Sequence, residues 1–574
     1  MRKILLLLWV CCHVWVVMAQ KAPRWAEKQR KAVLTITVYN KENQPIGTGN
    51  GFFVSDTGDA LSAYSLFKQA ARAEVKDPDG NRYPVDRILG ADELYDVIKF
   101  HVQVPKRVTA LSIASEPVPT GKLIYMLPFV EGKKGTFKQG LVREVNKLKE
   151  PYSYYKLSTL LEAGQANIPV LTESGDVFGL AQEDASGKNE ASYAVSAGYA
   201  NSLQISSTDV FSSIYQQMGI KRAWPTDPEQ AQVALYLFAS RQDPKSYLET
   251  LSDFIACFPR SLDGYLERAN HYALQRTALA DTPQEQQQLL DKAFADLQAA
   301  LPYMEHPSDL SYYRAKLIFA VATADSTFQD PNWSVVAAMS EIDKAIAEED
   351  LPLYHQMRAD FRLNAGQYAE AFEDYQIVNQ SPLASPVTWY WAAKAKAQIP
   401  GANFGELIAL LDSAVAACGN PPSQEAATYI LERIDLKLKL MNYMAALEDY
   451  ELYYQVMNGA VTDGFYYYRE QAKFRLGDLE GALADIQQAM RMSPMNPTYA
   501  AEEASVYVRM EKYEEALKSV ENALKLAPDF AACYRLRGVC LVRQKKMNEA
   551  CEALHQAKEL GDPVAERLIK QHCN

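Results

Sequence analysis

The N-terminal third of the chain offers few side chains for hydrolytic chemistry. A serine hydroxyl becomes an effective nucleophile only when an imidazole takes its proton and a carboxylate orients that imidazole. The chain has seven histidines, and only His101 lies between residues 20 and 200. The others are His13 near the start and five toward the C-terminus, namely His271, His306, His355, His555 and His572.

Asp96 and His101 are the nearest carboxylate and imidazole that could work together. Both lie in DVIKFH, which predicts a single strand. Five residues apart, their side chains would point to opposite faces, with their backbones separated by roughly 16 Å. We therefore interpret His101 as a half-buried strand histidine. A relocated dyad of these two groups is the alternative.

Three motifs predict the elements that would position such a site. Gly47–Phe67 reads GTGNGFFVSDTGDALSAYSLF, Asp96–Phe100 reads DVIKF, and Gly164–Val170 reads GQANIPV. Together they resemble the segments of trypsin-like bacterial serine proteases that carry the catalytic histidine, aspartate and serine. The resemblance covers about residues 32–202 and implies an all-β fold, a trypsin-like double β-barrel. Two further matches are Ser174–Leu180, similar to the penultimate hairpin of that family, and Ala191–Ser196, similar to its final strand.

The resemblance also implies that the catalytic groups are degenerate. Ser65 stands where the family has its histidine, and Ala166 stands where it has its nucleophilic serine. Asp96 is kept at the aspartate position. Gly164 remains in the loop that supplies oxyanion-binding N–H groups, but Asn167 and Ile168 replace two glycines. A β-branched residue is strained at positive φ, so we expect this loop to be remodelled and restoration of histidine and serine not to give efficient cleavage.

The first 19 residues have the pattern of a secretory signal peptide. A basic pair, Arg2-Lys3, precedes an apolar run that ends in Val17-Met18-Ala19. The mature chain is therefore expected outside the cytoplasm, either periplasmic or secreted. No other stretch approaches the ~20 apolar residues of a membrane span, so no integral membrane span is expected. The context of Cys11 and Cys12 argues against a lipid anchor.

Charge and cysteine usage narrow the classes of partner. The net charge is −12 with a pI near 5.3 and no basic run, which argues against a nucleic-acid partner. The cysteines after the leader show no CxxC or Cys/His spacing, so we expect neither a metal site nor a cofactor. In an oxidising compartment Cys540 and Cys551 could pair, and buried free thiols are the alternative. The six are Cys257, Cys418, Cys533, Cys540, Cys551 and Cys573.

The C-terminal part of the chain repeats with a period of 34 residues. Alanines recur at that step in two series, and Pro494 and Pro528 repeat it once more. Small residues on a second helix followed by proline resemble the tetratricopeptide repeat, an all-α solenoid of helix pairs. The alanine series are Ala482, Ala516, Ala550 and Ala489, Ala523, Ala557.

Looser units extend this pattern toward the N-terminus and set the expected domains. Their second helices would centre on Leu297, Ile342, Tyr375, Leu411 and Tyr450, and residues 230–258 would add a further pair. The predicted organisation is a signal peptide at 1–19, the barrel domain at 25–204, a linker with a closing helix at 205–226, and the repeat domain at 227–574. We expect the barrel and the repeats to fold independently.

The repeats place basic residues at one position of successive first helices. Lys439, Arg475, Arg509 and Arg543 lie near the ends of these helices, the last three 34 residues apart. In tetratricopeptide arrays this position resembles one that clamps carboxylates, so an acidic or C-terminal peptide is the expected ligand. The alternative is simply a favourable charge at each helix end. Tyr467 and Phe474 are the expected exposed aromatics of the same face.

Three functions are compatible with these patterns. The first is a noncatalytic protein-interaction scaffold that binds protein or peptide partners. The second is an active serine endopeptidase with a rearranged site. The third is an envelope protein that handles glycans. A serine-directed fluorophosphonate probe separates the first two, because it labels only an activated nucleophile.

Overall fold

The computed structural model describes residues 23–132, 136–147, 150–184, 190–325 and 328–573. The predicted signal peptide lies outside these residues. The chain divides into two compact units, Met1–Tyr303 and Met304–Asn574. The first contains two β-barrels and several helices, and the second is entirely helical apart from its loops.

The first barrel is a closed, antiparallel, six-stranded sheet in the order β1-β2-β3-β6-β5-β4. Alternate residues of its strands point inward, so that Ile36, Phe52 and Phe100 are completely buried. Glycine is required at Gly51, because a Cβ there would lie 2.5 Å from the carbonyl oxygen of Leu61. The strands are β1 (Val33–Tyr39), β2 (Pro45–Phe53), β3 (Asp59–Ser62), β4 (Arg72–Lys76), β5 (Arg82–Asp92) and β6 (Val97–Val102).

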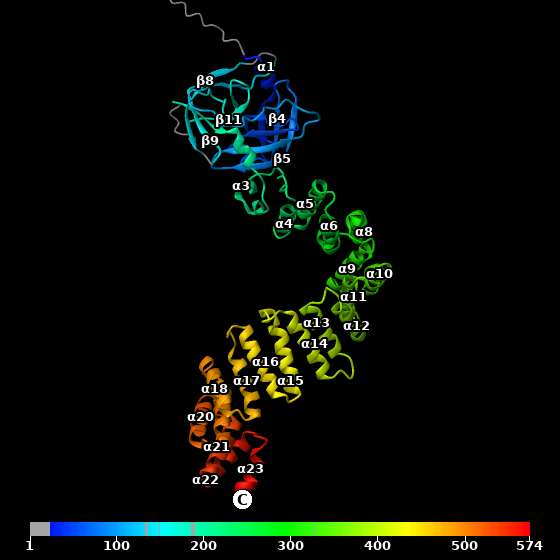
Figure 1. The fold of residues 1–574 in the computed structure, drawn as a ribbon, viewed down its shortest axis with the longest axis vertical. Coiled ribbons are helices and arrows are strands. Elements are labelled where there is room, and N and C mark those ends of the chain that lie inside the picture. The colour runs from blue at the N-terminus through cyan, green and yellow to red at the C-terminus, as the bar shows by residue number, and fades with distance from the viewer. Residues whose placement is uncertain (1–22, 133–135, 148–149, 185–189, 326–327, 574) are drawn as a thin grey trace, which may run out of the picture. The chain divides into compact units, whose positions relative to one another are not determined.

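The second barrel has the same architecture, in the order β10-β11-β12-β9-β8-β7. One apolar core contains residues of both barrels, including Leu61, Val177 and Val195. The predicted all-β, trypsin-like double barrel is thus confirmed (Figure 1). The strands are β7 (Leu123–Met126), β8 (Lys138–Lys147), β9 (Ser153–Leu157), β10 (Pro169–Leu171), β11 (Val177–Gln182) and β12 (Ser192–Ser196).

The segment after the barrels packs back onto the first of them. The N–H of Ile88 donates to the carbonyl of Lys221 at 2.8 Å, and the N–H of Ala223 donates to the carbonyl of Ile88 at 2.8 Å. The closing helix predicted within residues 205–226 is shorter than expected. It consists of a 3₁₀ turn, η3 (Ser207–Phe211), and a four-residue helix, α3 (Ser213–Gln216), because Ser212 between them has an extended backbone.

Five helices complete the first unit. Asp253 of α5 binds Arg87 of β5 through two hydrogen bonds, at 2.7 and 3.0 Å, and also accepts one from the Trp224 indole at 2.9 Å. This cluster fixes α5 against the barrel. The helices are α4 (Pro228–Ala239), α5 (Pro244–Cys257), α6 (Leu262–Leu274), α7 (Arg276–Leu279) and α8 (Pro283–Ala300).

The second unit is a series of helix pairs (Figure 1). All six alanines of the 34-residue series are completely buried, which is consistent with the predicted repeat. A small residue is also needed at Gly538 of α21, where a Cβ would lie 2.6 Å from Leu554 of α22. The helices are α9 (Asp309–Ala324), α10 (Val335–Glu348), α11 (Pro352–Asn364), α12 (Tyr368–Asn379), α13 (Pro386–Ala397), α14 (Phe404–Ala417), α15 (Ala427–Lys439), α16 (Tyr443–Val456), α17 (Asp463–Leu476), α18 (Leu479–Met492), α19 (Pro497–Arg509), α20 (Tyr513–Leu526), α21 (Ala531–Arg543), α22 (Met547–Glu559) and α23 (Ala565–His572).

Buried ion pairs join the two helices of several pairs. In each, an arginine of the first helix makes two hydrogen bonds to an aspartate 16 residues later, on the second helix. The aspartates are almost completely buried, and each also binds a second basic side chain of the first helix. The pairs are Arg358–Asp374, Arg433–Asp449 and Arg469–Asp485.

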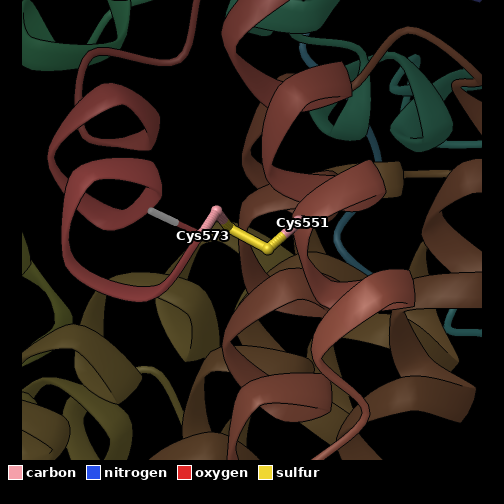
Figure 2. The surroundings of a disulfide bond; sticks show 2 residues. All are labelled: Cys551 and Cys573. Carbon is pink, nitrogen blue, oxygen red and sulfur yellow. A yellow bond between two sulfur atoms is a disulfide. The ribbon is translucent and has the colours of Figure 1, made fainter.

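Two alternatives were open for Cys540, a pair with Cys551 or a buried free thiol, and the structure shows the free thiol. Figure 2 shows that Cys551 of α22 instead forms a disulfide with Cys573, which follows α23. Cys540 is completely buried inside α21, whereas the packing of α23 on α22 brings the Cα atoms of Cys551 and Cys573 to 5.7 Å. Within the described residues, no helix is both long and apolar enough to cross a membrane.

Candidate functional site

The three degenerate catalytic positions lie together in one cleft of about 630 Å³. Ser65 is on a short helix, α2 (Tyr64–Phe67), Asp96 is in the turn before β6, and Ala166 is in the loop before β10. All three line the cleft, so the barrel fold assembles the site that the sequence predicted, although the residues themselves differ from a protease. The other lining residues are Leu94, Tyr95, Asn146, Lys147, Tyr154, Asn167, Gln182 and Glu183.

Ser65 forms two hydrogen bonds with the carboxylate of Asp96. Its N–H donates to Oδ1 at 2.6 Å and its hydroxyl donates to Oδ2 at 2.9 Å. Asp96 has a φ of 52°, a left-handed conformation that aspartate tolerates better than most residues. The carboxylate is therefore held where it could accept a hydrogen bond from an imidazole N–H, but the Ser65 hydroxyl donates to it instead. Ser65 has no imidazole beside it among the described residues that line the cleft.

His101 is engaged elsewhere in the barrel. Its Nδ1 lies 3.0 Å from Oδ1 of Asp59, the residue directly opposite it on β3. Lys99 also approaches Asp59, at 3.9 Å. His101 does not line the cleft, so the structure does not bring it together with Asp96 as the relocated dyad would require.

The loop before β10 avoids the strain expected of Ile168. Its left-handed positions are Gly164, with a φ of 79°, and Asn167, with a φ of 66°. Asparagine tolerates this conformation, and Ile168 is instead completely buried in the core of the second barrel. The premise that Ile168 would need positive φ is therefore wrong.

Asn50 fixes this loop from the first barrel. Its side-chain amide donates to the carbonyls of Gly164 and Ala166, both at 2.8 Å. Within the described residues, the N–H groups of Gly164 and Ala166 themselves have no hydrogen-bond partner. Two main-chain donors of this loop thus remain unpaired, as an oxyanion site requires, and Ala166 is the one of the two residues that lines the cleft. Sequence reasoning missed Asn50, whose only signal is a polar residue within the glycine run GTGNG.

Hydrogen-bonded polar side chains form another part of the cleft lining. The Tyr154 hydroxyl donates to Oε1 of Gln182 at 2.9 Å, and the Gln182 amide donates to the carbonyl of Tyr95 at 2.8 Å. Burial raises the pKa of the Tyr154 phenol, which therefore stays a hydrogen-bond donor at neutral pH. The cleft offers hydrogen-bonding groups, but the described residues that line it include no histidine, and Ala166 carries no hydroxyl.

The predicted basic residues lie in the last turns of α15, α17, α19 and α21. All four are exposed. Lys439 forms an exposed ion pair with Asp435 at 2.7 Å, and Arg543 lines a hollow of about 340 Å³ between α21, α22 and α23. The positions predicted from the 34-residue step are therefore accessible, although Lys439 already has an acidic neighbour.

The aromatic residues beside them are more buried than the sequence predicted. Tyr467 and Phe474 are only partly exposed, and the ring of Tyr467 lies 5.4 Å from that of Tyr499 on the next first helix. Tyr468 is the most accessible aromatic of this cluster, with 60% of its surface exposed. The reason is the helical step of about 100° per residue, which turns Tyr468 away from the neighbouring helix.

A buried acidic pair lies on the same first helices. Glu470 of α17 is completely buried, its Oε1 has no hydrogen-bond partner, and its Oε2 accepts from the amide of Gln471. Burial, and then the charge of Glu502 on α19, raise the pKa of Glu470 to about 8. Burial also raises the pKa of Glu502. At neutral pH Glu470 is therefore largely protonated.

Replacing Glu470 with glutamine should stabilise α17 and α19 at neutral pH. The unfolded chain loses this proton near pH 4.5 and the folded chain near pH 8, so stability falls as the pH rises between these values. Thermal unfolding followed at several pH values across this window should show a weaker pH dependence for Glu470→Gln. The exposed Glu521→Gln should behave like wild type, and an unchanged pH profile for Glu470→Gln would contradict the burial of a protonated carboxyl.

Comparison with known proteins agrees with the fold. Residues 49–180 match the family model of the trypsin-like peptidase domain, a stretch that includes Ser65, Asp96 and Ala166 and covers less than a quarter of the chain. No curated protein matches the sequence. In the part of the chain that the structure describes, no three His, Cys, Asp or Glu side chains gather as a metal site would require.

Proposed function

We propose that the chain is a noncatalytic protein-interaction scaffold, in which a protease-like barrel is joined to a helical repeat array that binds protein or peptide partners. The observation that carries this proposal is the bonding of Ser65. It satisfies Asp96 with its own N–H and hydroxyl, where a protease would have an imidazole. Ala166 presents only a methyl group at the position of the nucleophile.

The location follows from the leader. A basic pair, an apolar run and a small residue at position 19 direct a chain out of the cytoplasm, so we place the scaffold in the periplasm or outside the cell. Protein and peptide are the proposed ligand classes, because the array presents exposed basic residues on an acidic molecule. Nucleic acid is excluded from the proposal by the net charge of −12.

The purified protein is expected to hydrolyse neither casein nor peptide esters and to remain unlabelled by a fluorophosphonate. Loss of the base and nucleophile of a serine protease typically lowers kcat by about 10⁶. An active trypsin-type protease assayed beside it provides the positive control. Turnover that disappears in His101→Gln or Ser174→Ala would instead support a peptidase with a rearranged site.

Partner binding is expected to depend on the exposed arginines of the array. A hydrogen bond between charged groups contributes about 1.5–3 kcal/mol, so Arg475→Ala with Arg509→Ala should weaken binding by at least ~100-fold at low salt. The partner is first recovered by pull-down from an envelope fraction with the full chain and then titrated against both proteins. Circular dichroism should show unchanged helical content.

A matched control is available on the second helices of the same repeats. Arg491 and Lys525 lie in the last turns of α18 and α20, so their replacement removes the same charge from equivalent helix ends. Binding should be retained in Arg491→Ala with Lys525→Ala. Equal affinity of wild type and the Arg475/Arg509 variant would show that these arginines do not bind the partner. Tyr467, Phe474 and the barrel cleft would then be the next candidates.

A further inference from the structure

A second hollow, of about 440 Å³, lies where the segment after the barrels meets the first helix pair. Residues 205–225 form one wall, and α4 and α5 form the other. The hollow is distinct from the degenerate cleft, with which it shares no residue. Its apolar surface comes from side chains that include Val210, Met218, Trp224 and Phe238.

Arg222 supplies a positive charge to this hollow, and the nearby charge of Asp209 partly offsets it. One of its N–H groups donates to the main-chain carbonyl of Asp209 at 2.7 Å. Its guanidinium also lies 5.1 Å from the ring centre of Phe238 and 5.7 Å from that of Tyr215. Within the described residues, no carboxylate is within ion-pair distance of it, and burial lowers its pKa. A guanidinium carries five N–H donors, so several remain for a ligand.

The aspartates around the hollow are already engaged. Asp209, whose charge acts on Arg222, accepts hydrogen bonds from the N–H and the hydroxyl of Ser206. Asp253 also lines the hollow, but its oxygens accept hydrogen bonds from Arg87 and from the Trp224 indole, and Lys221 lies 3.6 Å away. It therefore has little capacity left to neutralise Arg222. Glu249, the other carboxylate in the lining, is exposed to solvent.

Gln242 favours a ligand that donates a hydrogen bond, whereas Arg222 favours one that accepts. Its side-chain oxygen is buried and has no hydrogen-bond partner. A buried acceptor without a donor is costly, so this oxygen favours a ligand that brings an N–H group. The hollow thus combines a cation that forms no ion pair among the described residues, an acceptor that lacks a donor, and an apolar surface between the two walls.

We propose that this hollow binds the terminal residue of a peptide, or a free amino acid, that has an apolar side chain. Its carboxylate would accept hydrogen bonds from Arg222, its N–H would donate to Gln242, and its side chain would pack against Trp224 and Phe238. These three groups occur on adjacent atoms of an α-amino acid unit, and a pocket of this size encloses a ligand of one or two residues. The inference does not depend on whether the barrel cleft is catalytic.

Isothermal titration of the full chain with N-acetyl-alanyl-phenylalanine tests the site, and the C-terminal amide of the same peptide is the comparison ligand. The acid should bind saturably. Removing the charge-assisted bond, either by amidation or by Arg222→Gln, should weaken binding by roughly 10- to 100-fold. Gln242→Leu, which removes the acceptor, should weaken binding about fivefold or more.

The controls separate the site from other surfaces and identify the source of the ligand. Arg260→Gln removes an exposed arginine that does not line the hollow and should leave the affinity unchanged. Free phenylalanine that binds as tightly as the peptide would assign the site to amino acids, and weaker binding would assign it to peptide C-termini. Equal affinity for acid and amide, unchanged binding by Arg222→Gln, or no saturable binding of the acid would overturn the proposal. The amide comparison requires no variant, so it holds even if Arg222→Gln folds poorly.

Discussion

Replacement of Asp449 by leucine is expected to destabilise the helix pair α15–α16 by about 3–5 kcal/mol. Arg433 binds both oxygens of Asp449, at 2.6 and 2.9 Å, and Lys437 adds a contact of 2.7 Å. Both cations are mostly buried, so the variant would leave Arg433 with its contact to Asp412 and would leave Lys437 without this ion pair. Amide hydrogen exchange in these two helices measures the loss locally, because a chain of several units does not unfold in one step.

Two variants distinguish charge burial from general damage. Asp435→Leu removes an aspartate from the same region, but the ion pair of Asp435 with Lys439 is exposed. The opening free energy from amide hydrogen exchange should therefore change by less than about 1 kcal/mol. Arg433→Met and Lys437→Met with Asp449→Leu replace all three charged groups by apolar ones and should recover much of the loss. If amide hydrogen exchange in these helices were as slow in Asp449→Leu as in wild type, the buried ion pairs would not stabilise the array.

Restoring the two missing groups is expected to create a reactive serine. In Ser65→His with Ala166→Ser, Asp96 is already positioned to receive the imidazole N–H, and the N–H groups of Gly164 and Ala166 remain available for an oxyanion. The sequence suggested an unsuitable loop, but the backbone removes that reason because Asn167, not Ile168, takes the left-handed position. Fluorophosphonate labelling should rise by several powers of ten, within the ~10⁶ that a complete catalytic unit contributes.

The single variants are the controls for this experiment. Ser65→His lacks a nucleophile and Ala166→Ser lacks a base, so each should label no faster than wild type. Adding Asp96→Asn to the double variant should reduce labelling by up to about 10⁴, since the imidazole loses its orienting carboxylate. Labelling of wild type, or none in the double variant, would show that the cleft is organised differently from a protease.

The barrels could be predicted because their motifs combine local pattern with a fixed separation along the chain. The glycine run, the aspartate before β6 and the loop before β10 identified the fold and brought Ser65, Asp96 and Ala166 into one cleft. The helical repeat could be predicted from alanines at a constant step, because helix pairs pack closely only at small residues. Both predictions depend only on where residues of a given type occur along the chain.

Features that depend on side-chain direction could not be predicted in this way. Asn50 reaches a loop more than 110 residues away, and no motif in the sequence marks Arg222 or the hollow that it lines. The buried Arg–Asp pairs have a constant separation of 16 residues, but charged residues are common on helices and the sequence does not show which of them face inward. Cys573 was overlooked as a partner because its proximity to Cys551 depends on how the last helix folds back.

That last helix gives the array a covalently fastened end. An isolated helix of eight residues is too short to be stable in water, so α23 depends on its contacts with α22 through Ala565 and Ile569. The bond between Cys551 and Cys573 keeps those contacts within reach after any local opening, because a detached helix remains tethered and closes again quickly. In a reducing compartment the same helix would be free to fray and uncover the apolar flank of the final repeat, which is the kind of surface that invites self-association.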